Sequence, residues 1–345
     1  MKPQISIIIP TYNSISTVEK VFESIKKQTL SKNSYEVLVI DGGSTDGTLQ
    51  VAKKYGFTVI NNPKQHQVYA KHMGHFAARS NYVMHLDSDE VLENKNSLEV
   101  KLKYFKLKDD LVAIVPSGHK TPQSLSAVNN IINDFGDPFS YYMYGYSFNH
   151  RFFVNQIKQK FHPKFENSDI VGFVFDNSSS LPGIEMSASG MVVDKKYVNK
   201  IIPQLKKHPH LISQSFFYIV ENGGGVGFTK NDPIIHYSAS SWGKYFKKLR
   251  SRVINNVFST DMGKSAFSGR LEYYSTWFSI KRFLFIPYSF LILPSLITSI
   301  SLVVTRKKLV YLSFPILCFY ISIMIVYFQS LKFMGKQIRD KGYGI

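Results

Sequence analysis

The sequence predicts an α/β domain with a mixed, mainly parallel sheet, followed by amphipathic helices and two transmembrane helices. Three observations support this fold class. In the first part of the chain, short β-branched runs alternate with stretches of helical spacing, and polar or acidic loops follow those runs. Near the carboxyl end lie two long stretches without charged residues. Alternating strands and helices favour an open sheet that binds ligands at the carboxyl ends of its strands.

Composition limits the possible partners. The chain has 345 residues, 44% of them hydrophobic, which is enough to bury a sizeable core. Its formal charge of +18 suits an anionic partner such as acidic lipid, a phosphorylated substrate or nucleic acid. The single cysteine, Cys318, excludes an intramolecular disulfide and a cysteine-based zinc site. The apolar run 5–9 is short and stops at Pro10, so we expect no signal peptide.

The first elements follow in order. Residues 5–9 form a β-branched run typical of a buried parallel strand, and the loop 10–13 follows it. Ser16 with Glu19 three positions later predicts a capping box at the start of a helix. A second strand, 36–40, ends in the glycine-rich loop 41–48. We therefore expect these loops to converge with a third at the carboxyl edge of the sheet.

That third loop is acidic. Asp87 and Asp89 follow the apolar run 82–84, and carboxylates at positions i and i+2 repel each other unless a cation lies between them. A divalent-metal site is one interpretation, and a solvated turn that caps a helix is the other. Asp46, in the glycine-rich loop, is expected to hold its turn by local hydrogen bonds.

Together the three loops carry a family resemblance. The strings PTYN (10–13), EVLVIDGGSTDGT (36–48) and DSDE (87–90) resemble the family 2 glycosyltransferases over residues 4–92, and the resemblance partly returns at 190–236. It implies a Rossmann-like GT-A domain that binds a nucleotide sugar. This catalytic domain would span residues 1–236, with a nucleotide-binding part at 1–115 and an acceptor part at 116–236.

The resemblance also implies site residues. Mg²⁺ or Mn²⁺ would be held by Asp87 and Asp89, with His236 near the metal or the donor diphosphate. Lys71 stands where the family often has arginine, and it lacks the two-pronged geometry of that side chain. The residues expected around the donor are Pro10, Thr11, Tyr12, Asn13, Asp41, Gly43, Lys71, Ser88 and His236.

One family feature is missing. The family helix that usually begins with Glu-Asp aligns here with Ile212 and Ser213, so the ordinary general base is absent. Another residue could take its place, and the candidates are Glu185, His210, His208 and Asp194. Alternatively, a lipid phosphate acceptor is already ionised near neutral pH and needs no base.

The segment after residue 236 looks membrane-associated. Within 237–282, apolar residues recur at helical spacing over 242–257 with lysines and arginines between them, which predicts an amphipathic interfacial helix. A basic helix packed on the catalytic domain is the alternative. Arg250 and Arg252 are candidates for gripping an acceptor phosphate. The aromatic-rich region 116–184 is either an acceptor loop lying on the membrane or ordinary core.

Residues 283–304 and 309–328 contain no charged side chain, and each run approaches the ~20 residues that cross a bilayer. We therefore predict a transmembrane hairpin and basic tail over 283–345. Two buried helices or a re-entrant hairpin are the alternatives. Cations before the first run, with Lys332, Lys336, Arg339 and Lys341 after the second, favour a multi-pass protein of the cell membrane with its catalytic domain on the cytoplasmic side.

Together with the family resemblance, these observations predict a membrane-bound, metal-dependent inverting glycosyltransferase. It would move a sugar from a nucleotide-sugar donor to a lipid-linked saccharide. The donor would be a UDP-sugar if Asp41 binds the nucleotide base. A polyprenyl-phosphate glycosyltransferase is the alternative enzyme. An inactive nucleotide-sugar-binding or scaffold protein is the alternative without catalysis. We expect no nucleic-acid partner, because much of the positive charge flanks the apolar runs. The oligomeric state is left open.

Overall fold

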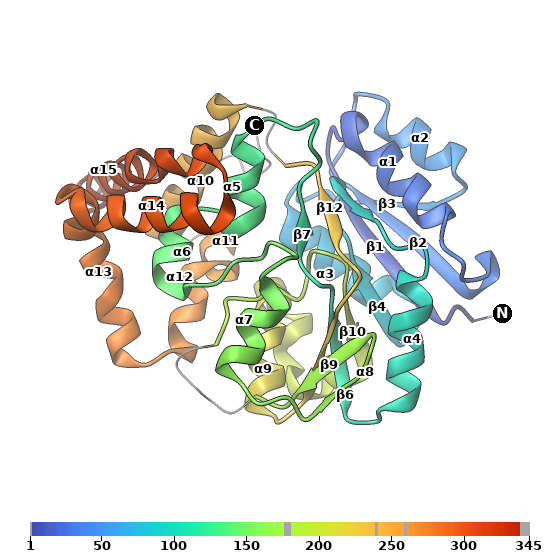
Figure 1. Cartoon of the computed structure of the whole chain (residues 1–345). Coiled ribbons are helices and arrows are strands. Elements are labelled where there is room, and N and C mark those ends of the chain that lie inside the picture. Colours follow the sequence, from blue (N-terminus) through green and yellow to red (C-terminus); the bar gives the residue numbers. More distant parts are fainter. Residues whose placement is uncertain (1, 176–180, 239–240, 259–260, 339–345) are drawn as a thin grey trace. The chain divides into compact units, whose positions relative to one another are not determined.

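The computed structural model describes residues 2–175, 181–238, 241–258 and 261–338 (Figure 1). Described residues of Met1–Pro122, Asn149–Ser178 and Ile184–Tyr237 form a first compact unit, and those of Gln123–Phe148, Ser179–Gly183 and Ser238–Ile345 form a second. The first unit ends one residue beyond the predicted boundary at 236. Residues 123–148 belong to the second unit, although the prediction assigns them to the acceptor part of the catalytic domain. Arg339 and Lys341 of the basic tail lie outside the described residues.

Nine strands among the described residues of the first unit form one mixed sheet. Its amino-terminal part is parallel, in the order β3 (Thr58–Asn61), β2 (Tyr35–Asp41), β1 (Ile5–Thr11) and β4 (Tyr82–His85). The sheet continues through β10 (Met191–Asp194), β6 (Leu111–Val115), β11 (Gly225–Thr229), β9 (Ile170–Phe173) and β8 (Phe165–Glu166). In this second part only β6 and β11 pair in parallel. The mixed α/β sheet is thus confirmed, and parallel pairing dominates only its first half.

A second, smaller sheet adjoins the acidic loop. It consists of β5 (Glu90–Leu92), β12 (Ile234–His236) and β7 (His119–Lys120). Strand β12 pairs antiparallel with β5, so that His236 lies opposite Glu90. This small sheet therefore brings the end of the first unit beside the acidic loop.

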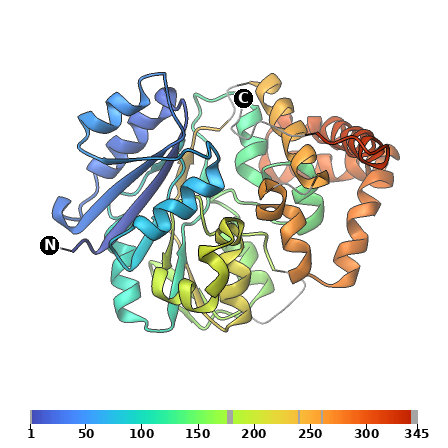
Figure 2. The ribbon, with the colours of Figure 1, turned by 180° about the vertical axis from the view of Figure 1, so that it is seen from behind.

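Helices cover both faces of the large sheet. Helices α1 (Ile15–Lys26), α2 (Thr48–Lys54) and α4 (Ser97–Leu107) pack their apolar residues against one face. Helices α3 (Gln67–Ala77) and α8 (Lys195–Ile201) lie together on the other, which Figure 2 shows from behind. The remaining helical segments of this unit are η1 (Lys32–Ser34), α7 (Phe153–Lys160), η2 (Pro203–Lys206), η3 (Pro209–Gln214) and α9 (Ser215–Glu221).

The start of α1 differs from the predicted capping box. The helix begins at Ile15 with Ser14 as its N-cap residue, so Ser16 lies inside the helix. The backbone N–H of Ile15 donates to Asp46 Oδ2 at 3.0 Å, and that of Ser14 donates to Thr48 Oγ1 at 2.9 Å. Side chains of the glycine-rich loop therefore satisfy donors that a capping box would have satisfied locally.

Gly74 sets the distance between α3 and the sheet. A Cβ atom built on Gly74 would lie 2.3 Å from Cγ2 of Ile8, a fully buried residue of β1. Only a residue without a side chain lets the helix backbone approach the strand this closely. Since Lys71 is one turn earlier on α3, this approach also fixes the position of Lys71 relative to the strand ends.

Gly74→Ala should lower the free energy of unfolding by about 1–3 kcal/mol, because the added methyl group overpacks a rigid core. Urea unfolding of both variants measures this. Gly243→Ala is the matched control, since its added Cβ meets nothing closer than Ser241 Oγ at 4.0 Å and alanine favours a helix. Equal stability of the two variants would contradict the proposed close packing.

The second unit is helical. It contains α5 (Val128–Phe135), α6 (Pro138–Tyr144), α10 (Trp242–Val257), α11 (Asp261–Ser265), α12 (Phe267–Arg270), η4 (Leu271–Tyr273), α13 (Thr276–Phe290), α14 (Leu293–Arg306), η5 (Leu309–Ser313) and α15 (Phe314–Phe333). Asp134 is fully buried in this unit. It accepts hydrogen bonds from Arg306 Nε at 3.0 Å and from the Tyr311 hydroxyl at 2.7 Å. This buried acid therefore joins α5 to the turn between α14 and α15.

The packing of 242–257 differs from the expectation that its apolar face lies in the membrane. The residues form helix α10 as expected, but the apolar side chains Tyr245, Leu249 and Val253 are buried in a core shared with α15. Their partners include Leu317 and Ile321 of α15, so this face of α10 contacts protein rather than lipid. In the aromatic-rich region, Phe135 is part of this same core, and Phe153 is buried within the first unit.

The first predicted transmembrane helix, 283–304, is not one continuous helix. Its residues are divided between α13 and α14, which meet at 88°. The break is physical, since Ile292 has a φ of 59° and Pro294 occupies the first turn of α14. Among the described residues, the 25-residue segment Leu309–Phe333 is long and apolar enough to cross a membrane alone. The bent pair passes this test only when its two helices are taken together.

Candidate active site

Three loops meet at the carboxyl ends of β1, β2 and β4, as the sequence predicts. Thr11 Oγ1 donates to Asp41 Oδ1 at 2.8 Å and thereby joins β1 to β2. The hydroxyls of Ser14 and Ser88 lie 3.0 Å apart and join the first loop to the acidic loop. The first loop is also joined to the glycine-rich loop, because Asn13 N donates to Ser44 Oγ at 2.8 Å. The three predicted loops therefore form one connected surface.

The predicted donor residues of the first loop divide into two groups. Pro10 and Thr11 are still part of strand β1 and are buried, so they position the loop rather than line its surface. Tyr12 and Asn13 follow the strand and are partly or fully exposed. The Tyr12 ring lies close to Gly42, where an added Cβ would be 3.3 Å from Cδ2. Asn13 has a φ of 47°, and its Oδ1 accepts from Thr45 N at 2.9 Å.

Asp41 accepts more hydrogen bonds within the protein than its predicted contact with the donor requires. Its Oδ2 accepts from the backbone N–H groups of Gly43 and Ser44, both at 2.8 Å. Its Oδ1 accepts from the hydroxyls of Thr11 and Ser44. Four bonds match the approximately four acceptor sites of a carboxylate. Asp41 therefore holds the start of the loop, and contact with a nucleotide base requires exchange of one of these bonds.

Asp46 performs the local structural role predicted for it. Its Oδ1 accepts from the Thr48 hydroxyl at 2.6 Å and from the Thr48 backbone N–H at 3.1 Å. Its Oδ2 accepts from Ile15 N, as described for the start of α1. The pKa of Asp46 is lowered, because these hydrogen bonds outweigh the effect of burial.

A buried lysine lies between two acids at the centre of the site. Lys71 Nζ is 3.3 Å from Asp87 Oδ1 and 3.2 Å from Glu185 Oε1. Its side chain is 3% exposed. Burial alone would lower the pKa of Lys71, but the charges of Asp87, Glu185 and Glu90 outweigh it and raise the pKa. Lys71 is therefore a permanent cation that links the acidic loop to residue 185.

Glu90 has a role that sequence reasoning missed. Its Oε2 accepts from the backbone N–H groups of Asp87 and Ser189, both at 2.8 Å, and its Oε1 accepts from Ser189 Oγ at 3.1 Å. Burial, followed by the charge of Asp87, raises the pKa of Glu90 to about 8. Glu90 thus ties the acidic loop to the segment before β10. The only sequence signal for this was its place in the acidic run 87–90.

The metal prediction has a partial structural basis. Asp89 Oδ2 lies 3.5 Å from His236 Nε2, and Tyr237 N donates to the Asp89 carbonyl at 2.8 Å. Burial raises the pKa of Asp87, with Lys71 opposing this effect and Asp89 adding to it. Across the described part of the chain, no three His, Cys, Asp or Glu side chains group closely enough to hold a metal. Two carboxylates nevertheless fit Mg²⁺ or Mn²⁺, because such ions often take one or two protein carboxylates and complete their shell with water and substrate phosphates.

The candidate bases fall in different places. Glu185 Oε1 accepts from Ser187 Oγ at 3.0 Å and from Ser213 Oγ at 3.4 Å, in addition to its contact with Lys71. Asp194 caps α8 by accepting from Tyr197 N at 2.9 Å, which is a structural role. His208 and His210 lie beside each other at η3, with ring centroids 5.9 Å apart. Of the four candidates, the structure brings Glu185 to the acidic loop.

The candidate acceptor-phosphate residues lie on α10 in the second unit. Arg252 donates to Asp137 Oδ2 at 2.6 Å, so a phosphate would have to compete with this carboxylate. The Arg250 guanidinium lies 5.3 Å from the centre of the Phe328 ring. Arg250 is exposed, whereas Arg252 is only partly so.

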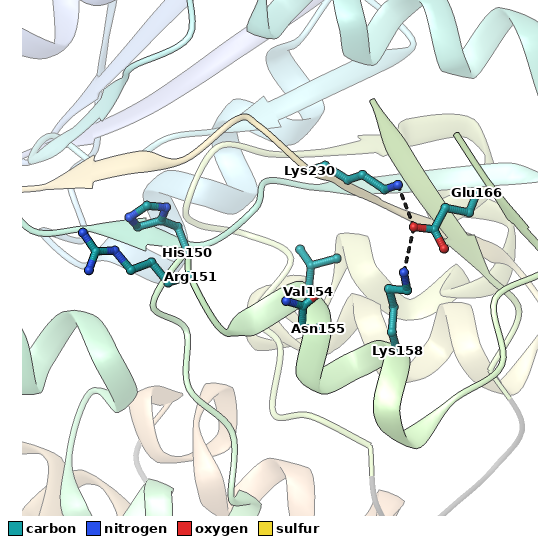
Figure 3. Close-up of a pocket in the computed structure, with 7 residues that line it drawn as sticks. All are labelled: His150, Arg151, Val154, Asn155, Lys158, Glu166 and Lys230. Atoms are coloured by element: carbon teal, nitrogen blue, oxygen red, sulfur yellow. Dashed lines mark hydrogen bonds and ion pairs between the residues drawn. The ribbon is translucent and has the colours of Figure 1, made fainter. Parts of the chain in front are cut away.

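A separate cavity of about 220 Å³ lies between α7, β8 and the end of β11 (Figure 3). Glu166 Oε1 forms ion pairs with Lys158 at 2.7 Å and with Lys230 at 2.6 Å. His150 and Arg151 line the other end of the cavity. None of the sequence-predicted site residues lines it. Because Glu166 neutralises much of its positive charge, the cavity is a weaker anion site than its lysines suggest.

A large mixed sheet with polar and acidic loops at its parallel strand ends defines an α/β domain with a ligand site at that edge. Residues 6–166 match the sequence model of Glycosyl transferase family 2. The predicted resemblance is thereby confirmed.

Several characterised proteins are similar over part of the chain. Glycosyltransferase AglE of Haloferax volcanii is 37% identical over 78 residues, which cover 23% of this chain and 25% of AglE. A dolichyl N-acetyl-alpha-D-glucosaminyl phosphate 3-beta-D-2,3-diacetamido-2,3-dideoxy-beta-D-glucuronosyltransferase of Methanococcus voltae is 32% identical over 133 residues, 36% of this chain and 41% of that protein. The chain thus spans a quarter to two-fifths of these relatives. The solved mannosyltransferase PcManGT of Pyrobaculum calidifontis aligns over 96% of this chain and 88% of its own, with 11% identity and a TM-score of 0.48.

Lys71→Gln should cost about 3–5 kcal/mol of stability, because it leaves two carboxylates facing each other without their buried cation. Lys54→Gln is the matched control. Lys54 pairs with Glu19 at 3.2 Å, a similar distance, but its side chain is 71% exposed, so its replacement should leave stability almost unchanged. Urea unfolding compares the variants, and equal losses would contradict the buried role of Lys71.

Proposed function

We propose that this protein is a membrane-bound inverting glycosyltransferase that uses a nucleotide-sugar donor, UDP-linked in the first instance, and extends a lipid-linked saccharide. The observation that carries the proposal is the connected surface of three loops at the strand ends, with Asp87, Asp89 and Lys71 at its centre. The match of residues 6–166 to Glycosyl transferase family 2 supports the reaction class. The Methanococcus relative, whose name specifies a dolichyl phosphate-linked acceptor, supports a lipid-borne acceptor.

Each group has a place in this reaction. Tyr12, on the exposed side of the first loop, would stack on the nucleotide base, and the polar backbone around Gly43 would meet the ribose. Asp87 and Asp89 would hold Mg²⁺ or Mn²⁺, with His236 orienting Asp89. The bound ion neutralises the charge of a diphosphate leaving group. The carbon of the sugar that bears the diphosphate would be attacked from the opposite side, which inverts its configuration.

The second unit supports attachment to a membrane. Six aliphatic side chains on α13–α15 and their connections are each more than three-fifths exposed, namely Leu291, Leu293, Ile297, Val304, Leu309 and Ile316. An exposed apolar surface of this extent is typical of a protein or membrane contact. Lysine and arginine residues flank it at 281–282 and 307–308, as expected at an acidic headgroup layer. We propose that this surface enters the bilayer and that the catalytic domain is cytoplasmic.

A panel of nucleotide sugars is offered to the wild-type protein together with a lipid extract of the source cells. The protein should release a nucleoside diphosphate from one of these donors. Mass spectrometry then identifies the glycosylated lipid. Asp89→Asn and metal removal by EDTA should each reduce release at least about 100-fold, and Mn²⁺ or Mg²⁺ should reverse the effect of EDTA. The exposed Asp109→Asn variant is the control and should keep full activity. Donor binding without turnover would favour the inactive binding protein, and turnover in EDTA would refute the metal.

Ile297→Glu combined with Val304→Glu should reduce binding to vesicles that contain anionic lipid by at least about 10-fold, because each charge costs on the order of 2–3 kcal/mol in the hydrocarbon layer. Flotation of the full-length protein measures this. Leu107→Glu places the same charge at an exposed leucine of α4 in the first unit and should leave binding unchanged. If the double variant floats as well as the wild type, the apolar surface does not contact lipid.

A further inference from the structure

Ser213 occupies the position at which the sequence resemblance expects the catalytic acid. It lies at the end of η3, immediately before α9, and is fully buried. A serine hydroxyl cannot accept a proton near neutral pH in the way a carboxylate does. An enzyme that extends a saccharide must still remove a proton from the acceptor hydroxyl, so a carboxylate has to come from elsewhere in the fold.

Glu185 brings a carboxylate to this position from a different segment. Its Oε1 accepts from Ser213 Oγ at 3.4 Å and from Ser187 Oγ at 3.0 Å. The two serine hydroxyls are themselves 3.3 Å apart. Glu185 precedes β10, about thirty residues earlier in the chain than the expected acid. Glu185 therefore places a carboxylate beside Ser213, although the aligned position in the sequence has no acid.

The surroundings of Glu185 fit a reacting group better than a structural one. Its side chain is 37% exposed, whereas those of Ser187 and Ser213 are completely buried. It is thus held from the protein side and accessible from the solvent side. Lys71 Nζ, 3.2 Å away, also contacts Asp87 of the acidic loop. Glu185 and the proposed metal-binding acid consequently contact the same ammonium group.

We propose that Glu185 is the general base of this glycosyltransferase and that Ser187, Ser213 and Lys71 are positioning residues for it. This inference rests on the proposed function. In the step, the acceptor hydroxyl oxygen forms a bond to the anomeric carbon while the bond from that carbon to the diphosphate oxygen breaks. The nucleoside diphosphate leaves with the electron pair, and the hydroxyl proton passes to the Glu185 carboxylate. No redox change occurs, and charge and atoms balance.

The test compares Glu185→Gln with the wild type in the nucleoside diphosphate release assay. The amide keeps the shape of the side chain but cannot accept the proton, so kcat should fall about 100- to 10,000-fold. The KM for the donor should stay within about twofold, and the melting temperature should stay close to that of the wild type. Adding Ser213→Asp to Glu185→Gln should restore part of kcat, because it returns a carboxylate to the aligned position. Glu93→Gln, which opens a surface ion pair with Lys120, is the matched control and should remain fully active.

The outcomes distinguish a wrong assignment of the general base from a wrong proposed function. If the wild type releases nucleoside diphosphate and Glu185→Gln does so equally fast, Glu185 is not the base, while the glycosyltransferase function stands. If the wild type releases none from any donor, the proposed function itself is wrong and the inference falls with it. If Glu185→Gln lowers the melting temperature, nucleoside diphosphate release by Glu185→Ala is measured with and without added formate. Recovery of turnover with the external carboxylate supports the base, and no recovery overturns it.

Discussion

The arrangement of the candidate site depends on one buried ammonium group. Lys71 contacts both Asp87 and Glu185, and without it these two carboxylates would lose their shared buried cation. Its position in turn depends on Gly74, which lets α3 approach β1 closely. An arginine at position 71 would offer a planar, forked donor group, whereas the lysine ammonium can meet two acids from different directions at once. Lys71 is thus part of the framework of the site.

The sequence predicts much of the first unit because its signals are local. The β-branched run of β1, the turn residues around Asp46 and the acidic run at Asp87 each depend on a few neighbouring residues, and the structure brings the three loops together as expected. The start of α1 was mispredicted because its partners are Asp46 and Thr48, about thirty residues away. The role of Glu90 was missed for the same reason, since its partner Ser189 is distant in the chain.

In the second unit, composition and spacing predicted the helices less accurately than they did in the first. Uncharged length suggested two equal transmembrane helices, but the backbone at Ile292 divides the first into two helices at 88°. Helical spacing correctly predicted α10, yet spacing does not reveal what covers an apolar face, and here α15 covers it. Charge counting was affected in a similar way. Arg306 lies between the two uncharged runs, where a count of charges would place it near lipid headgroups, but its guanidinium is bound to the buried Asp134. It is therefore unavailable to lipid headgroups.

The bonds of Glu90 have a consequence for substrate selection. Because this one carboxyl group holds both the Asp87 backbone and the Ser189 backbone, the loop assigned to the leaving group and the segment that carries Glu185 are fastened to each other. In the proposed reaction, the spacing between Asp87 and Glu185 would therefore be set by the protein before either substrate binds. A change of substrate preference at Tyr12 and Asn13, outside these bonds, would then disturb the site less than a change of this spacing, which would break buried hydrogen bonds.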